Sequence, residues 1–278
     1  MPKTWLITGS SRGFGRELAQ AVLESGDRLV ATARRPEQLD DLVRKYGDSV
    51  RAVALDVTDA EAARAAVQTA VAEFGSLDVV VNNAGYADSA PIEEMSDEDF
   101  RAQIDANLYG VVNVTKAALP VLRQQRSGHV VQFSSIGGRV GGSPGMGAYQ
   151  TAKFAVEGFS EVLNNEVKPF GVKVLIVEPG PFRTDWAGSS MAIAPVGPEY
   201  EETVGAMNRG RAGAATWPGD PARAAKIILD VVAHPEPPLR LLLGAAAVEL
   251  AAKSSAERAA EARQWADVSR AADFPPGE

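Results

Sequence analysis

The stretch T-G-S-S-R-G-F-G at residues 8–15 joins an apolar segment, 3–8, to a segment with helical periodicity, 14–25. Its glycines, Gly9, Gly13 and Gly15, have the spacing G-x-x-x-G-x-G. One glycine permits a tight turn, a second lets the backbone approach a pyrophosphate at a helix N-terminus, and a third allows close packing of helix on strand. The stretch predicts a dinucleotide-binding turn, although glycine triplets also occur in plain turns.

Short apolar segments alternate with longer amphipathic ones along the chain. Segments that are nearly all apolar are typical of strands covered on both faces. Their alternation with helices predicts an α/β fold, a single doubly wound parallel (Rossmann) sheet of about seven strands in one domain, 1–278. The predicted strands are 3–8, 28–33, 50–55, 77–82, 129–134, 172–178 and 239–243. The predicted helices are 14–25, 36–46, 59–74, 97–126, 148–169 and 222–233.

Two segments interrupt this alternation. Residues 186–220 are rich in Gly, Ala, Pro and Met and are too long for an ordinary connection. They are predicted to form a substrate-binding lid, with a short helical excursion of no special role as the alternative. Residues 245–268 are rich in alanine and charge, which predicts a C-terminal helix on the surface or at a subunit contact.

Composition excludes several classes of function. The chain has no cysteine and only two histidines, His129 and His234, which argues against disulfides, a thiol nucleophile and a metal site. The net charge of −8, without a basic stripe, argues against nucleic acid as a partner. With neither a signal peptide nor a run of eighteen apolar residues, we expect a cytoplasmic protein that does not enter a membrane.

The end of the second predicted strand indicates which dinucleotide binds. A carboxylate at this point would bind the ribose 2′-hydroxyl and repel a 2′-phosphate. The sequence instead reads T-A-R-R-P, with Arg34 and Arg35 directly after the strand and Arg12 inside the glycine turn. Guanidinium groups match the geometry of a phosphate, so the sequence favours NADP(H) over NAD(H). The alternative is that these arginines are ordinary solvated side chains.

Two more strand ends carry polar residues toward the same edge of the sheet. Asp56 follows the third strand and could accept a hydrogen bond from an adenine amino group. Alternatively, it could cap the helix 59–74, a role for which Thr58 or Asp59 is better placed. The sequence N-N-A-G at 82–85 ends the fourth strand, where small residues would let a cofactor lie against the backbone. The same four residues could form a plain turn.

Tyr149 and Lys153 are four residues apart in G-A-Y-Q-T-A-K, within a predicted helix. Positions i and i+4 share a helix face, so both side chains can point into one cleft. A nearby ammonium group lowers the pKa of a phenol, which would make Tyr149 an acid or base near neutral pH. The alternative is a surface pair on a helix.

Two further polar positions could complete such a site. Ser134 and Ser135 end the fifth predicted strand, and either could hydrogen-bond a substrate carbonyl. Asn107 lies inside a predicted helix, where asparagine is disfavoured, so we expect it to have a specific role. It could hold Lys153 through a water molecule and pass protons outward.

Together these motifs resemble the short-chain dehydrogenase/reductase family. The resemblance covers roughly residues 1–185 and rests on T-G-S-S-R-G-F-G, D-V-T, N-N-A-G, Asn107, the S-S strand end, Y-x-x-x-K, and P-G-P-F-R-T at 179–184. It implies a catalytic group of Asn107, Ser135, Tyr149 and Lys153. Ser135 precedes Tyr149 by fourteen residues, one more than is usual in the family, so Ser134 remains the alternative. The implied cofactor-binding residues are Gly9, Ser11, Arg12, Gly13, Phe14, Gly15, Arg34, Asp56, Val57, Asn83, Ala84, Gly85, Tyr149, Lys153, Pro179, Gly180, Phe182 and Thr184.

The resemblance predicts an NADP(H)-dependent oxidoreductase that interconverts a ketone or aldehyde and an alcohol. Apolar residues should shape a pocket for a hydrophobic carbonyl substrate; they are Met146, Trp186, Met191 and Met207, with Trp217 nearby. In the family, helices corresponding to 97–126 and 148–169 pair subunits, so a homodimer or homotetramer is expected. The alternatives are a non-catalytic NADP-binding redox regulator, a dehydratase or epimerase using the same tyrosine, and a methyltransferase.

Overall fold

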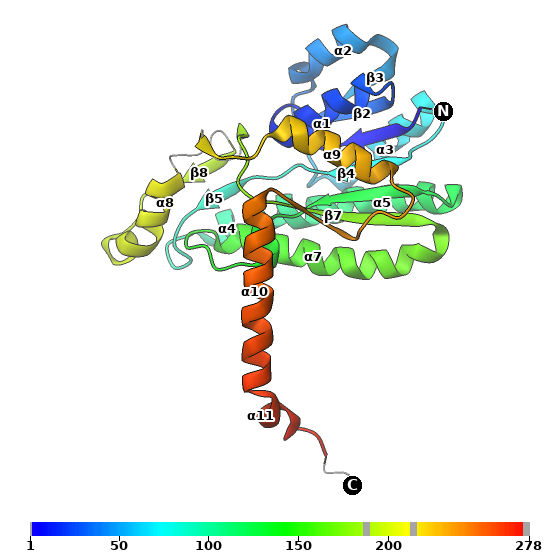
Figure 1. Ribbon diagram of the computed structural model, residues 1–278. Helices are drawn as coiled ribbons and strands as arrows, with labels where there is room; N and C mark the ends of the chain where they lie inside the picture. Colours follow the sequence, from blue (N-terminus) through cyan, green and yellow to red (C-terminus); the bar gives the residue numbers. More distant parts are fainter. Residues whose placement is uncertain (1, 186–189, 212–215, 275–278) are drawn as a thin grey trace.

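The computed structural model describes residues 2–185, 190–211 and 216–274, and its main sheet has seven parallel strands (Figure 1). Their spatial order is β3-β2-β1-β4-β6-β7-β9, which confirms the doubly wound fold and all seven predicted strands. The strand order reverses between β1 and β4, where such sheets form their ligand crevice. The strands are β1 (Thr4–Ile7), β2 (Arg28–Ala33), β3 (Val50–Ala54), β4 (Val79–Asn82), β6 (Gly128–Phe133), β7 (Val172–Pro179) and β9 (Arg240–Leu243).

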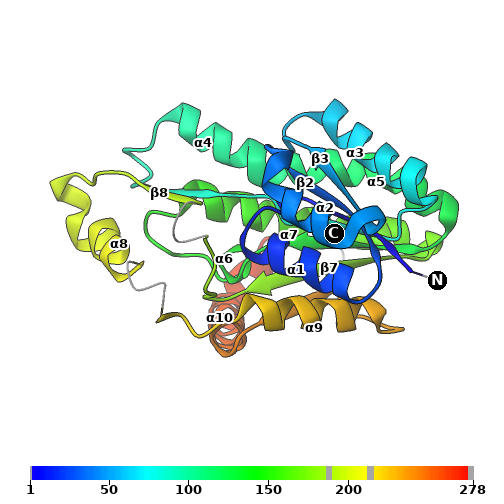
Figure 2. The same ribbon diagram turned by 90° about the horizontal axis from the view of Figure 1, so that it is seen from above.

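Helices cover both faces of this sheet (Figure 2). One hydrophobic cluster joins the sheet to α1 (Gly13–Glu24), α2 (Asp40–Tyr46) and α9 (Pro221–Ala233). A second cluster joins the opposite face to α3 (Ala60–Phe74), α5 (Gly110–Gln125) and α7 (Gly147–Val167). Successive residues of a strand point to opposite faces, so Trp5 and Ile7 of β1 belong to the first cluster and Leu6 to the second.

Local sequence features set the helix boundaries. The Asp59 side chain accepts hydrogen bonds from the backbone N–H groups of Glu61 and Ala62 and so caps α3. Gly75 ends the same helix with φ of +82°, a conformation that glycine adopts without strain. Asp56 is therefore not the cap.

The prediction of one continuous helix over 97–126 is wrong. The structure has α4 (Asp97–Ile104), a π-helical turn η3 (Asp105–Tyr109) and then α5. The wide turn contains Asn107, the residue whose helix propensity was unfavourable. Such π-turns are frequent at functional sites. The predicted helix 36–46 begins as a 3₁₀ turn, η1 (Pro36–Leu39), and 148–169 ends in another, η4 (Lys168–Phe170).

The segment 186–220 has structure of its own. Its strand β8 (Met191–Ile193) pairs in parallel with β5 (Ala87–Ser89), and neither strand was predicted. It continues through η6 (Pro198–Tyr200) and the π-helical η7 (Glu201–Gly205) into α8 (Ala206–Arg211). The described part of this segment is thus tethered to the body by backbone pairing. Trp186, one of the predicted pocket residues, lies outside the described residues.

The buried residues of the C-terminal helix, Ala247 and Ala251, lie near its start. The predicted helix 245–268 is present as α10 (Ala245–Gln264) and α11 (Ala266–Arg270), and α10 projects away from the sheet (Figure 1). A short unpredicted helix, α6 (Ile136–Arg139), follows β6. Within 2–185, 190–211 and 216–274, no helix combines the length and the apolar character needed to cross a bilayer.

Two carboxylates are buried where α7 packs on the end of β7. Glu178 is fully buried and lies 3.3 Å from both Arg139 Nη1 and Arg240 Nε. Glu157 lies 3.2 Å from the same Arg240 Nε, and Arg240 also pairs with the more exposed Glu161. Burial, and to a smaller extent the charge of Glu178, raises the pKa of Glu157 to about 7, against the opposing effects of Ser134 and Arg240. Glu157 therefore holds its proton close to neutral pH.

The raised pKa makes stability depend on pH. Between about pH 5 and 7 the folded protein retains the Glu157 proton while the unfolded chain loses it, so Glu157 should lower the unfolding free energy as pH rises through this range. Glu157→Gln should remove this effect. The unfolding free energy of the variant minus that of the wild type should therefore be about 2 kcal/mol larger at pH 8 than at pH 5. Urea unfolding at both pH values measures the difference.

Glu161→Gln is the matched control, since it removes a half-exposed partner of the same arginine. It should show no such change with pH. A Glu157→Gln variant that differs from the wild type by the same amount at both pH values would contradict the prediction.

Candidate functional site

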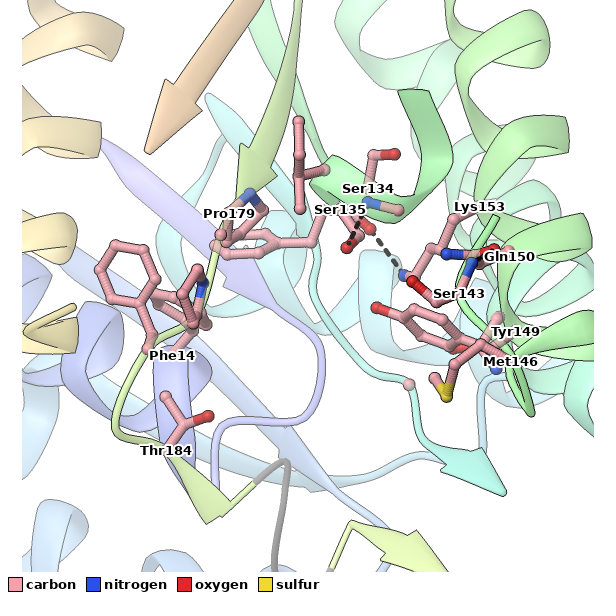
Figure 3. A pocket seen from close by; sticks show the side chains of 18 of the residues that line it. Phe14, Ser134, Ser135, Ser143, Met146, Tyr149, Gln150, Lys153, Pro179 and Thr184 are labelled. Carbon is pink, nitrogen blue, oxygen red and sulfur yellow. Dashed lines mark hydrogen bonds between the residues drawn. The ribbon is translucent and has the colours of Figure 1, made fainter. Parts of the chain in front are cut away.

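A cavity of about 500 Å³ opens at the carboxyl ends of the strands (Figure 3). Phe14 and Thr184 lie on one side of it, and Tyr149, Lys153 and Ser143 lie on the other (Figure 3). Segments distant in sequence therefore meet here, as predicted from the strand ends. The predicted residues that line the cavity are Phe14, Asn83, Gly85, Asn107, Ser134, Ser135, Met146, Tyr149, Lys153, Pro179, Gly180, Phe182, Thr184, Met207 and Trp217.

The glycine turn is packed tightly against the end of β4. A Cβ atom on Gly15 would lie 2.2 Å from the Gly9 carbonyl oxygen and 2.4 Å from Asn83 Nδ2. Gly9 has φ of +70°, and a Cβ there would lie 3.0 Å from the Ala84 Cα. Gly13 has φ of +54°. The three positions thus need glycine for its backbone conformation or its lack of a side chain.

The sequence N-N-A-G at 82–85 ties the end of β1 to the end of β4. Asn83 Nδ2 donates to the carbonyl oxygens of Thr8, at 2.9 Å, and Gly9, at 3.2 Å. The backbone N–H groups of Asn83 and Ala84 both donate to Thr8 Oγ1. These contacts leave a small-residue surface at the switch point, which fits a nucleotide lying against the backbone.

Aromatic rings form the wall between the glycine turn and the later strands. The ring centroid of Phe14 is 5.5 Å from that of Phe133 and 4.9 Å from that of Phe182. Thr184 lies beside Gly13, where a Cβ on the glycine would be 3.5 Å from the threonine Cβ. The segment 179–184 therefore packs beside the glycine turn on one side of the cavity, an arrangement that fits a bound dinucleotide.

The predicted nucleotide-specificity residues lie outside the cavity lining, along the same edge. Arg12 precedes α1 as its N-cap residue, and Arg34 directly follows β2; both are exposed. Ser11 is half-buried in the turn. Asp56 accepts hydrogen bonds from the backbone N–H and hydroxyl of Thr58, at 3.0 and 2.7 Å.

Val57 does not line the cavity and instead packs against the start of α5. Its side chain faces Gly110, where an added Cβ would lie 2.5 Å from Val57 Cγ2. Its carbonyl oxygen accepts a hydrogen bond from Asn113 Nδ2 at 3.0 Å. Val57 thus fixes the loop after β3 against the start of α5.

Tyr149 and Lys153 are both buried and point from α7 toward the cavity (Figure 3). Lys153 Nζ donates to the Phe133 carbonyl oxygen at 2.7 Å and lies 5.6 Å from the centroid of the Tyr149 ring. The Tyr149 hydroxyl is hydrogen-bonded to the Ser135 side chain. The alternative of a surface pair is wrong.

The expected lowering of the Tyr149 pKa is also wrong for this structure. Burial raises the pKa of Tyr149 to about 12, and the hydrogen bond with Ser135 only partly opposes the rise. Burial lowers the pKa of Lys153 to about 8, against the opposing charge of Glu157. The ammonium group lies beside the ring and is directed at a carbonyl oxygen, so desolvation outweighs its attraction for a phenolate.

The two serines at the end of β6 face different surroundings. Ser135 caps α6 by accepting a hydrogen bond from Gly137 N at 3.0 Å, and it also contacts Tyr149. Ser134 is buried on the side of Glu157, within reach of Gly138. The geometry favours Ser135 over Ser134 as the serine that acts with Tyr149.

Asn107 is held rigidly by the π-turn. Its Nδ2 donates to the carbonyl oxygens of Tyr86 and Gln103, both at 2.9 Å. Its Oδ1 is buried, has no hydrogen-bond partner among the described residues, and faces Gly85. A Cβ on Gly85 would lie 2.5 Å from that oxygen and 3.8 Å from Lys153 Nζ. The wide turn therefore directs an acceptor toward Lys153.

The substrate side of the cavity differs in part from the prediction. Met191 is not in the lining; it packs behind it, in a small buried cluster with Ala87, Met146 and Tyr149. The residues of the lining that the sequence reasoning did not single out are Phe133, Ile136, Gly137, Ser143, Gln150, Pro181, Gly210 and Arg211. Gly210 and Arg211 lie in the segment 186–220 that was predicted as a lid, but no sequence pattern marked Arg211 individually.

Comparisons with known proteins agree with this geometry. Residues 3–192 match the family described as short chain dehydrogenase. The oxidoreductase BOA17 of Botryotinia fuckeliana is 51% identical, over 98% of this chain and 99% of its own length. The 3-ketodihydrosphingosine reductase of Bacteroides thetaiotaomicron is 36% identical, over 91% of this chain and 92% of its own.

Solved structures show the same fold. The crystal structure of a short-chain dehydrogenase from Streptomyces avermitilis superposes with a TM-score of 0.92 at 42% identity, covering 99% of this chain and 100% of that one. An alcohol dehydrogenase from Thermococcus sibiricus, complexed with 5-hydroxy-NADP, superposes with a TM-score of 0.71 at 27% identity, covering 87% of this chain and 96% of that one. The chain belongs to the short-chain dehydrogenase family, oxidoreductases that act on alcohol or carbonyl groups with a nicotinamide dinucleotide.

Proposed function

We propose that the protein is an NADP(H)-dependent oxidoreductase that interconverts a ketone or aldehyde and the corresponding alcohol, with Tyr149 as acid and base. The observation that carries the proposal is the buried contact between the Tyr149 hydroxyl and Ser135, beside Lys153 and inside the cavity. A substrate oxygen placed between the two hydroxyls would accept hydrogen bonds from both.

The bound nicotinamide would supply or accept the hydride. In reduction, Tyr149 gives its proton to the substrate oxygen as the carbonyl carbon becomes tetrahedral. A phenol with a pKa of about 12 is protonated at neutral pH and so carries the proton that this step needs. Ser135 holds the same oxygen and stabilises the negative charge that develops on it.

Lys153 and Asn107 support the proton transfer. Lys153 lines the same cavity. Its ammonium group would stabilise the negative charge of the phenolate that remains after Tyr149 gives up its proton. The Oδ1 atom of Asn107 faces the space next to Lys153 Nζ. A water molecule bound between them would carry a replacement proton toward the solvent.

The cofactor-facing surface fits a dinucleotide phosphate. Gly9, Gly13 and Gly15 leave backbone accessible at the N-terminus of α1, where a pyrophosphate is favoured by the helix dipole. No acidic residue directly follows β2; Arg34 occupies that place, so a 2′-phosphate would meet a guanidinium group. The relative from Thermococcus sibiricus was solved with an NADP derivative, in line with this preference.

The substrate side favours a carbonyl compound with an apolar body. Met146, Met207 and Trp217 line the cavity next to Tyr149. Methionine side chains adapt to ligands of varied shape. The homo-oligomer implied by the family resemblance stays a prediction. An apolar side chain on one of the helices expected to pair subunits, Val162 on α7, is 58% exposed.

Tyr149→Phe tests the assignment of the acid. The variant keeps the ring but lacks the proton, so turnover of a panel of ketones and alcohols, followed by NADPH absorbance, should fall about 100-fold or more. NADPH binding, measured by fluorescence, should remain. Tyr109→Phe removes an exposed phenol and should leave turnover unchanged. Turnover by Tyr149→Phe within twofold of the wild type would refute the proposed mechanism.

Arg34→Asp tests the preference for NADPH. The change places a carboxylate at the end of β2, which should repel the 2′-phosphate and weaken NADPH binding about tenfold or more relative to NADH. Arg35→Asp makes the same change of charge one residue further and is the matched control. If both variants weaken NADPH binding equally, the preference depends on the overall positive charge of this region and not on Arg34 in particular. If Arg34→Asp leaves the preference unchanged, the assignment is refuted.

A further inference from the structure

Arg211, the last residue of α8, lines the cavity that also contains Tyr149. Its guanidinium group is half-buried, and burial lowers its pKa. Other arginines of the described chain that are partly buried, such as Arg139 and Arg240, face carboxylates. Arg211 faces no carboxylate among the described residues, so the role of its charge in the cavity is still to be explained.

The partners of Arg211 are all neutral. Nη1 donates to Ser89 Oγ and to Asn208 Oδ1, both at 2.8 Å, and Nη2 donates to the Pro144 carbonyl oxygen at 3.2 Å. Within 2–185, 190–211 and 216–274, no carboxylate forms an ion pair with it. Partial removal of a cation from water without a counter-ion is unfavourable, so a half-buried arginine at a cavity fits a site for an anion.

These partners also hold the guanidinium group in one orientation. Ser89 belongs to β5, Pro144 to the loop before α7, and Asn208 to α8. The loop can approach closely because Gly145 has φ of +81°, and a Cβ on it would lie 2.6 Å from Ser89 Oγ. Of the five N–H donors of an arginine, the three hydrogen bonds use three, which leaves two for a ligand.

We propose that Arg211 binds a carboxylate at the end of the substrate remote from the reacting carbonyl group. This inference rests on the proposed function and makes the substrate class an oxo-carboxylic acid, or the hydroxy acid that corresponds to it. The carboxylate forms a charge-assisted pair with Arg211, and the apolar chain between the two groups lies against Met146, Met207 and Trp217.

A binding experiment tests the inference without turnover. Unbranched alkanoates of six to twelve carbons and the matching alkanamides are titrated calorimetrically into the full-length protein, alone and with NADPH. The alkanoate should bind about tenfold more tightly than the amide at one preferred length or more. An equal affinity of acid and amide at every length in the wild type would overturn the proposal.

Arg211→Gln should abolish the preference for the acid, and Arg211→Lys should restore part of it. Arg209→Gln is the matched control, because Arg209 lies on the same helix and pairs with Glu201 in solvent. It should keep the wild-type preference. If Arg211 serves only to fasten α8 to the loop, Arg211→Gln will weaken acid and amide alike, and this outcome would also overturn the proposal.

Turnover separates this inference from the proposed function. The wild type is assayed with oxo acids of the same lengths and with their methyl esters, and kcat/KM should favour the acids. Equal reduction of acids and esters would refute the carboxylate site while supporting the reductase. Selective binding of alkanoates without reduction of any compound would support the carboxylate site and count against the reductase.

Discussion

The absence of a side chain at Gly15 is the constraint on which the site depends. The first turn of α1 lies so close to the Gly9 carbonyl oxygen and to Asn83 that a methyl group would overlap both. This packing brings the N-terminus of a helix to the carboxyl edge of β1, next to the end of β4. Since the helices that follow β1 and β4 cover opposite faces of the sheet, the edge between them opens into a cavity.

Sequence patterns predicted the parts of the molecule that local physics determines. The strands of the sheet are buried on both faces, so their apolar composition marks them, and the i, i+4 spacing places Tyr149 and Lys153 on one helix face. The pairing of β5 with β8 joins short segments more than a hundred residues apart and leaves no local pattern. Arg211 likewise reaches the cavity only through contacts with Ser89 and Pro144, which are 122 and 67 residues away.

Burial, more than neighbouring charge, determines the protonation of this site. Desolvation raises the pKa of Tyr149 and lowers that of Lys153, and it is also the largest effect on Glu157. Spacing in the sequence indicates which groups are neighbours but not how much water they lose. The expectation that Lys153 lowers the Tyr149 pKa failed for this reason, and the result is a phenol that keeps its proton at neutral pH.

The π-helical turn between α4 and α5 restricts how the chain can change in length. Each residue of a regular α-helix corresponds to about 100° of rotation. A chain one residue shorter at Asp105–Tyr109 would form a single regular helix, in which the faces before and after the turn could no longer both keep their orientation. Either Asn107 would leave its position beside Gly85, or Gly110 would lose its close contact with Val57. Helical register, in addition to side-chain identity, is therefore under constraint at this point.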